Sequence, residues 1–392
     1  MVPRSRLQAK LEAAIAAAGN PIEARCLRAE RAGLLARQGQ LEAARAAIDE
    51  LTTQLAWAPN LPLRAWLALA EGLHGYYSAL GRGAQQQVEQ AYLLARDGPS
   101  MPRLHALSAA WLANMAFAND DMPRMVALVH EALATAAPDN HAARARAALV
   151  AGYAYHFAAA SARAQPWYEA SRRHAIAEGD ETQLSALMHN QAWMRASQAR
   201  LSLLFDATDG DARGGIEVAA SAASAAEAGD AVAHALMGAE SIGHYDAGIG
   251  TASLGSLVPM LRAQVLTAQG RWDDALALFE SHFEAARRDG LERLLPCLLA
   301  DRAWCEWQSG KAAKAQALVT SAEQALVQEC DTDDRAMAHA RLAHVCHALG
   351  DASAAQRHRD AAHRDHLAHR QQQQRIVVLL DEALAGLEPA TL

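Results

Sequence analysis

Small residues recur at fixed distances around turn glycines along this chain. Gly270, Gly310 and Gly350 are spaced by 40 residues, and Gly39 near the N-terminus has similar surroundings. An alanine stands seven residues before each glycine and another stands five residues after it: Ala32, Ala263, Ala303 and Ala343 before, and Ala44, Ala275, Ala315 and Ala355 after. Small residues on both sides of a turn predict two antiparallel helices that cross closely. The pattern therefore predicts repeated helix pairs.

A third column strengthens this interpretation. Nine residues after the glycine, a large apolar residue recurs as Ile48, Phe279 and Val319, although Arg359 interrupts the column in the last copy. Weaker copies fit around the following positions: Gly81, Asp120, Ser161 and Ala199. The repeat thus covers residues 20–362, and nearly all of this range is expected to be helical.

The segment from Gly270 to Phe279 carries the most specific motif, because Trp272 and Ala275 stand between its turn glycine and its phenylalanine. These residues resemble the tetratricopeptide repeat, in the long-period form found in bacterial regulators and sensors. The resemblance implies an all-α fold: a right-handed superhelical solenoid of about eight antiparallel helix pairs, with a period of about 40 residues.

The repeats suggest a division of the chain into four parts. We expect N-terminal repeats over 1–198, an irregular insertion over 199–256, C-terminal repeats over 257–350, and a long C-terminal helix with its tail over 351–392. The insertion is either a surface elaboration or a loop that contacts a ligand.

The C-terminal helix carries a short apolar seam. Its members alternate in steps of four and three: Ile376, Leu380, Ala383 and Leu387. Such a seam either caps the solenoid or pairs two chains into a homodimer.

Composition agrees with a helical protein and narrows the class of function. Apolar residues make up 52% of the 392 residues but aromatic residues only 5%, which disfavours sheet. A net charge of −8 argues against a nucleic-acid partner. Neither a secretory signal nor an apolar stretch long enough for a bilayer is expected. Five cysteines without a CxxC pair fit a cytoplasmic protein.

No catalytic motif is complete in the sequence. Gly310-Lys311 has Ala312 where a phosphate-binding loop needs Ser or Thr. His130-Glu131 lacks the second histidine of a zinc-protease helix. The chain is therefore expected to be no enzyme, and to use neither a cofactor nor a metal.

The resemblance also implies a binding groove. In the family, positions six and three residues before the turn line the concave surface. Here those positions are occupied by Asn114, Phe117, Tyr155, Trp193, Gln264, Trp304, Trp307, His344 and His347. Aromatic rings mixed with polar groups suit a peptide, while ordinary packing is the alternative. The expected function is a regulatory protein- or peptide-binding scaffold, or alternatively a ligand- or peptide-responsive sensor that signals through its C-terminal helix or its oligomeric state.

Overall fold

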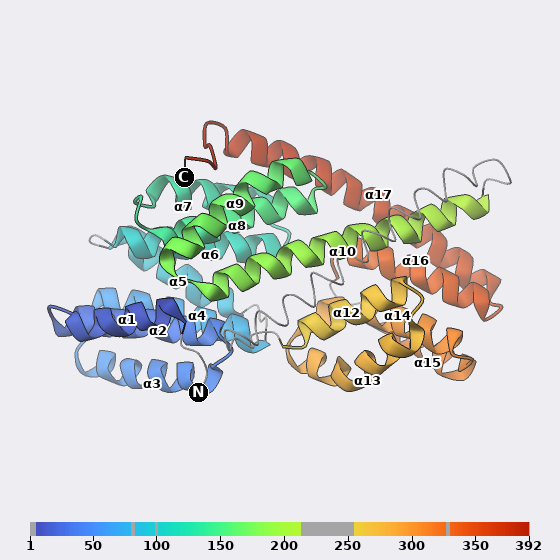
Figure 1. Ribbon diagram of the computed structural model, residues 1–392, viewed down its shortest axis with the longest axis horizontal. Helices are drawn as coiled ribbons and strands as arrows, with labels where there is room; N and C mark the ends of the chain where they lie inside the picture. Colours follow the sequence, from blue (N-terminus) through green and yellow to red (C-terminus); the bar gives the residue numbers. More distant parts are fainter. Residues whose placement is uncertain (1–4, 80–82, 99–100, 213–254, 327–329, 392) are drawn as a thin grey trace. The chain divides into compact units, whose positions relative to one another are not determined.

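The computed structural model describes residues 5–79, 83–98, 101–212, 255–326 and 330–391. Within these ranges the chain forms 16 α-helices and no strand (Figure 1). The sequence prediction of an all-α protein is thereby confirmed. Consecutive helices pack as antiparallel pairs, which is consistent with a helical repeat.

The chain folds into two compact units. Of the described residues, the first unit holds 5–188 and 374–391, and the second unit holds 189–212 and 255–373. Two helices, α10 (Glu181–Ala212) and α17 (Ala352–Ala383), contribute residues to both units.

The first unit contains four helix pairs preceded by a shorter helix. Its helices are α1 (Arg6–Ala17), α2 (Pro21–Arg37), α3 (Leu41–Trp57), α4 (Leu61–Ala79), α5 (Gly83–Asp97), α6 (Pro102–Ala118), α7 (Met122–Thr135), α8 (His141–Phe157), α9 (Ser161–Glu178), the start of α10 and the end of α17. The first helices of successive pairs, α2, α4, α6 and α8, contact one another in that order. Alanines dominate the buried faces of α6 and α8, and their small side chains allow the close approach.

Helix α1 contacts both α2 and the turn between α9 and α10. The backbone N–H of Leu7 donates to the carbonyl oxygen of Gly179 at 2.9 Å, and Arg6 Nε lies 2.6 Å from Glu181 Oε1. Ser5 Oγ accepts from the side chain of Gln38, the residue that follows α2, at 3.0 Å. The turn between α9 and α10 is therefore held next to α1 and the end of α2.

The second unit repeats the paired arrangement. Its helices are the end of α10, α12 (Leu257–Ala268), α13 (Trp272–Arg288), a 3₁₀ turn η1 (Leu291–Leu294), α14 (Leu295–Gln308), α15 (Ala312–Ala325), α16 (Thr332–Ala348) and most of α17. Helices α12, α14 and α16 contact one another in sequence, as α2, α4, α6 and α8 do in the first unit.

The turn glycines of the repeat have left-handed backbone conformations. Gly39, Gly270, Gly310 and Gly350 have φ values of 75°, 75°, 76° and 85°, a left-handed conformation that glycine adopts without steric cost. Two non-glycine residues hold the same conformation in weaker copies, Asp120 at 59° and Ala159 at 57°. The turn expected at Gly81 lies outside the described residues.

The segment expected to be an irregular insertion begins differently from the prediction. The boundary and the weak repeat placed at residue 199 fall inside α10, which continues to Ala212. The sequence from Glu181 to Asp209 contains neither Gly nor Pro, so nothing interrupts the helix there. The rest of the expected insertion, 213–254, lies outside the described residues.

The apolar seam of the C-terminal helix packs into the first unit. Ile376 and Leu380 are buried in the core formed by α2 to α9, and Ala383 and Leu387 pack against that core. This is the packing that the capping alternative expects. Pairing of two chains through the same helix stays a prediction.

Candidate functional site

The residues expected to line one groove fall in both units. Asn114, Phe117 and Tyr155 belong to the first unit, and the other six belong to the second. Asn114 Nδ2 donates to Tyr76 Oη at 3.4 Å. The ring centroid of Phe117 lies 5.0 Å from that of Tyr153, within a group of edge-to-face aromatic contacts.

Tyr155 anchors the C-terminal segment. Its side chain is only 5% exposed, and its hydroxyl donates to Asp381 Oδ1 at 3.0 Å. Burial, followed by this carboxylate, raises the pKa of Tyr155 above its ordinary value. The other carboxylate oxygen of Asp381 pairs with Arg163. In the structure Tyr155 therefore holds the chain's own C-terminal residues.

Two of the predicted groove residues in the second unit form a stacked pair. The ring centroids of Trp304 and Trp307 lie 5.2 Å apart with the planes at 19°. Trp272 meets Trp304 edge-on at 6.4 Å, and His344 lies 6.1 Å from the same ring. All four rings are partly exposed. We call these four residues the aromatic surface.

A cluster of buried charged residues packs against the aromatic surface through Arg341. Arg341 lies with its guanidinium carbon 5.6 Å from the Trp304 ring centroid, and its Nε donates to Asp301 at 3.0 Å. Asp301 also accepts from Arg200 at 2.5 Å. The predicted groove residue Gln264 is 1% exposed and belongs to this cluster, because its amide oxygen can accept from Arg200 at 3.0 Å. Gln264 therefore packs inside the unit.

The remaining two predicted residues of the second unit differ in exposure. Trp193 is partly buried on α10, and His347 is exposed near the end of α16. Of the nine predicted residues, the structure brings Trp304, Trp307 and His344 together at one surface.

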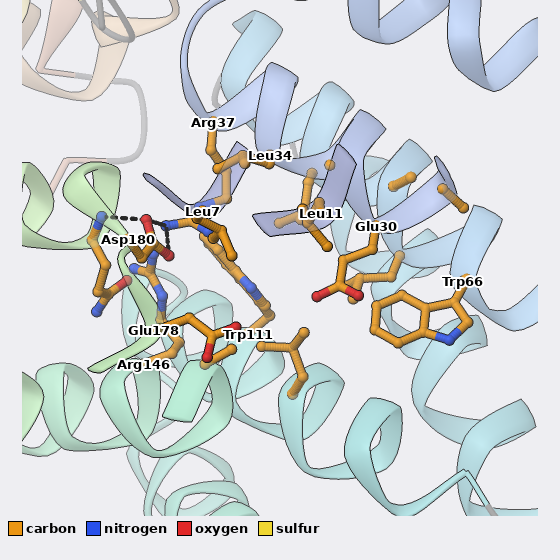
Figure 2. Close-up of a pocket in the computed structure, with 18 residues that line it drawn as sticks. Leu7, Leu11, Glu30, Leu34, Arg37, Trp66, Trp111, Arg146, Glu178 and Asp180 are labelled. Atoms are coloured by element: carbon orange, nitrogen blue, oxygen red, sulfur yellow. Dashed lines mark hydrogen bonds and ion pairs between the residues drawn. The ribbon is translucent and has the colours of Figure 1, made fainter. Parts of the chain in front are cut away.

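The first unit contains a cavity that the sequence did not predict (Figure 2). It has a volume of about 40 Å³ and is lined from α1, from the first helices α2, α4, α6 and α8, and from the turn between α9 and α10. Figure 2 shows Arg37, Arg146, Asp180 and Glu178 gathered on one side and Trp66 on the other.

Arg37 and Asp180 form a buried ion pair at this cavity. Arg37 Nη2 lies 2.8 Å from Asp180 Oδ2 and 3.0 Å from Oδ1. Burial opposes the charge of Arg37, but Asp180 and then Tyr77 hold the pKa of Arg37 above its ordinary value. Asp180 also accepts from the backbone N–H of Gln183 at 2.9 Å and so caps α10.

Arg146 also contacts Trp111 but has a different electrostatic environment from Arg37. Its guanidinium carbon is 3.8 Å from the Trp111 ring centroid, whereas that of Arg37 is 5.8 Å away. Burial, together with the charge of Arg37, lowers the pKa of Arg146 from its ordinary value. Such a shift marks a guanidinium whose charge the surroundings compensate poorly.

The sequence does carry one signal for this cavity. Arg146 stands within the otherwise apolar run Ala145 to Ala151 of α8. An arginine is rarely buried without a partner, so its position in this helix indicates a buried polar site. Its neighbours Arg37 and Asp180 are 143 residues apart, and no local pattern joins them.

The sequence matches none of the known protein-family models, and no curated protein matches it either. Within the described ranges, every helix is too short or too polar to cross a membrane. In the same part of the chain, no three His, Cys, Asp or Glu side chains gather in a way that could hold a metal ion.

Proposed function

We propose that the chain is a non-catalytic binding protein that recognises an extended peptide segment of a partner, in a regulatory role. The proposal includes the right-handed superhelical solenoid implied by the likeness to tetratricopeptide repeats. Paired helices with left-handed turns and closely packed alanines support that likeness. Likeness of fold alone does not define a function, so the proposal rests on a surface.

The observation that carries the proposal is the partly exposed stack of Trp304 and Trp307. The chain is poor in aromatic residues, yet four rings converge on one surface of the second unit. Tryptophan combines a large apolar face with one N–H donor and is enriched where proteins bind one another.

The position of the stack favours an extended segment over a small molecule. Trp304 and Trp307 lie on α14 and His344 lies on α16, the first helices of two successive pairs. The surface thus continues from one repeat to the next, as an extended ligand requires. We propose that a peptide with apolar or proline side chains packs on the two indole rings.

A second candidate function is a sensor that signals through α17. One observation favours it: this single helix carries residues of both units, and Asp381 near its end is bound by Tyr155 and Arg163. A ligand that altered these contacts would act on a helix shared by both units.

Selection of binders from a displayed library of random peptides tests the peptide proposal. We expect selected peptides to lose at least about 30-fold in affinity for Trp304→Ala and for Trp307→Ala, because a hot-spot residue contributes about 2 kcal/mol or more.

The matched control is Trp57→Ala, since Trp57 is 86% exposed and lies in the first unit. We expect this variant to bind the selected peptides as the unchanged chain does. Equal loss of affinity in all three variants, or no loss in any, would show that the aromatic surface is not the binding site.

A further inference from the structure

The carboxylates that line the cavity of the first unit are all matched by cations. The closest pairs are 2.5 Å between Glu30 and Arg103, 3.5 Å between Glu178 and Lys10, and 2.8 Å between Asp180 and Arg37. A buried carboxylate is stable only with such a partner. The negative charge of the cavity wall is therefore already compensated.

Arg146 is the charge of this wall that has no ion-pair partner among the described residues, although it contacts the Trp111 ring. It is 4% exposed, and its Nε and Nη2 find no hydrogen-bond acceptor among the residues that the structure describes. Nε of Arg37 also has no acceptor there. Three buried donor nitrogens of two arginines thus have no acceptor within the described part of the chain, and leaving such donors unsatisfied is costly for a folded protein.

The size and the walls of the cavity limit what could supply the missing acceptors. A volume of about 40 Å³ holds about three water molecules at roughly 10–15 Å³ each, which is the size of a carboxylate group with one or two further carbons. Leu7, Leu34 and Leu73 line the same cavity and suit a short alkyl group.

The charge of the cluster also limits the ligand. The three carboxylates are matched by Arg103, Lys10 and Arg37, so Arg146 leaves a surplus of one positive charge. A monovalent anion would neutralise that surplus. A planar guanidinium binds the two oxygens of a carboxylate side by side, which a spherical halide cannot reproduce.

We propose that this cavity is a binding site for a small monocarboxylate, with the carboxylate held by Arg146 and Arg37 and a short alkyl group against the leucines. The site lies within the first unit and is independent of the peptide surface proposed above. A volume of about 40 Å³ is too small for the residues of a peptide and favours a small free acid.

Calorimetric titration and thermal unfolding of the full chain with sodium acetate test this proposal, with sodium chloride at the same ionic strength as reference. We expect acetate to bind saturably and to raise the unfolding temperature above the chloride reference, since a ligand of the folded state stabilises it. Identical unfolding temperatures and no binding heat would overturn the proposal.

Arg146→Met is the central variant, and it should have two effects. Acetate should bind at least about tenfold more weakly, because a charged hydrogen-bonded partner is lost. Without acetate the variant should unfold at a higher temperature than the unchanged chain, because an uncompensated buried charge is gone. Arg172→Met, which changes an exposed arginine of α9, should show neither effect.

A cavity-filling variant and a competing peptide provide two further tests of the acid site. Leu69→Phe narrows the cavity while both arginines stay, and it should abolish the acetate effect even if Arg146→Met fails to fold. A short peptide with a free C-terminal carboxylate should not compete with acetate. Competition by that peptide, or an acetate effect retained in Leu69→Phe and Arg146→Met, would contradict a small-acid site in this cavity.

Discussion

At the scale of single residues, two histidines of the second unit contact each other, His358 being buried and His339 partly buried. The Nδ1 atoms of His339 on α16 and His358 on α17 lie 2.9 Å apart, so one ring donates and the other accepts. Nε2 of His358 lies 3.0 Å from Glu323 Oε1. Burial, followed by the charge of His358, lowers the pKa of His339 to about 4.

This shift predicts that acid destabilises the protein. Below the ordinary histidine pKa of 6.5 the unfolded chain binds a proton at His339, and the folded chain does not until about pH 4. The unfolded state therefore holds more protons in this window, and the free energy of unfolding falls as pH falls. The contribution of His339 is up to about 1.4 kcal/mol for each pH unit.

Urea unfolding across this pH window measures the effect. We expect His339→Gln to weaken the pH dependence, because glutamine can keep a hydrogen bond but does not titrate. His347→Gln, at an exposed histidine of the same helix, should leave the pH dependence unchanged. If both variants respond to pH as the unchanged chain does, His339 is not the source of the pH dependence.

The residue scale also shows what the sequence could predict. The spacing predicts the turn glycines, because a left-handed residue at a helix end has a strong preference for glycine. Ala159 takes the same conformation without being glycine, and the sequence pattern predicts this turn two residues later, near Ser161. Where glycine is absent, the turn position follows from the packing of the two helices, which a single sequence does not reveal.

At the scale of helices, small residues set the crossing points. The alanines of the two predicted columns are all buried, from Ala32 and Ala44 in the first pair to Ala343 and Ala355 in the last. The large apolar column behaves likewise, with Ile48 and Phe279 fully enclosed. These columns were predictable because each repeat buries the same face against its neighbour.

The packing of the end of α17 against the first unit can be tested directly. Leu380 is completely buried in the core of the first unit, whereas Val378 on the same helix is 54% exposed. We expect Leu380→Ala to lower the free energy of unfolding by about 2–5 kcal/mol, through lost burial and a residual cavity.

Chemical denaturation measures this difference, with Val378→Ala as the matched control. The control removes apolar atoms from the same helix and should change stability by only about 0.5 kcal/mol. If Leu380→Ala were as stable as Val378→Ala, the C-terminal segment would not cap the first unit.

At the scale of the whole molecule, charged residues far apart in the chain meet inside each unit. Arg37 and Asp180 are 143 residues apart, and Arg200 and Asp301 are 101 residues apart. Helical periodicity predicts which faces are buried but not which distant charges pair across them. For this reason the repeat could be predicted from the sequence, whereas the cavity at Arg146 could not.

The predicted groove shows the same limit. Trp304 and His344 share one surface because they occupy equivalent positions on the neighbouring helices α14 and α16, and Trp307 stacks on Trp304 from three residues further along α14. Gln264 and Tyr155 came from the same positional rule but are buried by partners from other parts of the chain. The position of a residue within a repeat therefore predicts the side of the helix on which it lies. Contacts with distant parts of the chain decide whether that side is exposed or buried.

If the stacked tryptophans form a surface for a partner, they are not part of the core. The unfolding free energy of Trp307→Ala, compared with that of Phe279→Ala in chemical denaturation, tests it most directly. Phe279 is fully buried, and its replacement should cost about 3–5 kcal/mol. We predict that Trp307→Ala costs no more than about half of that, because its ring is partly exposed. An equal loss of stability in the two variants would place Trp307 in the core and contradict the claim.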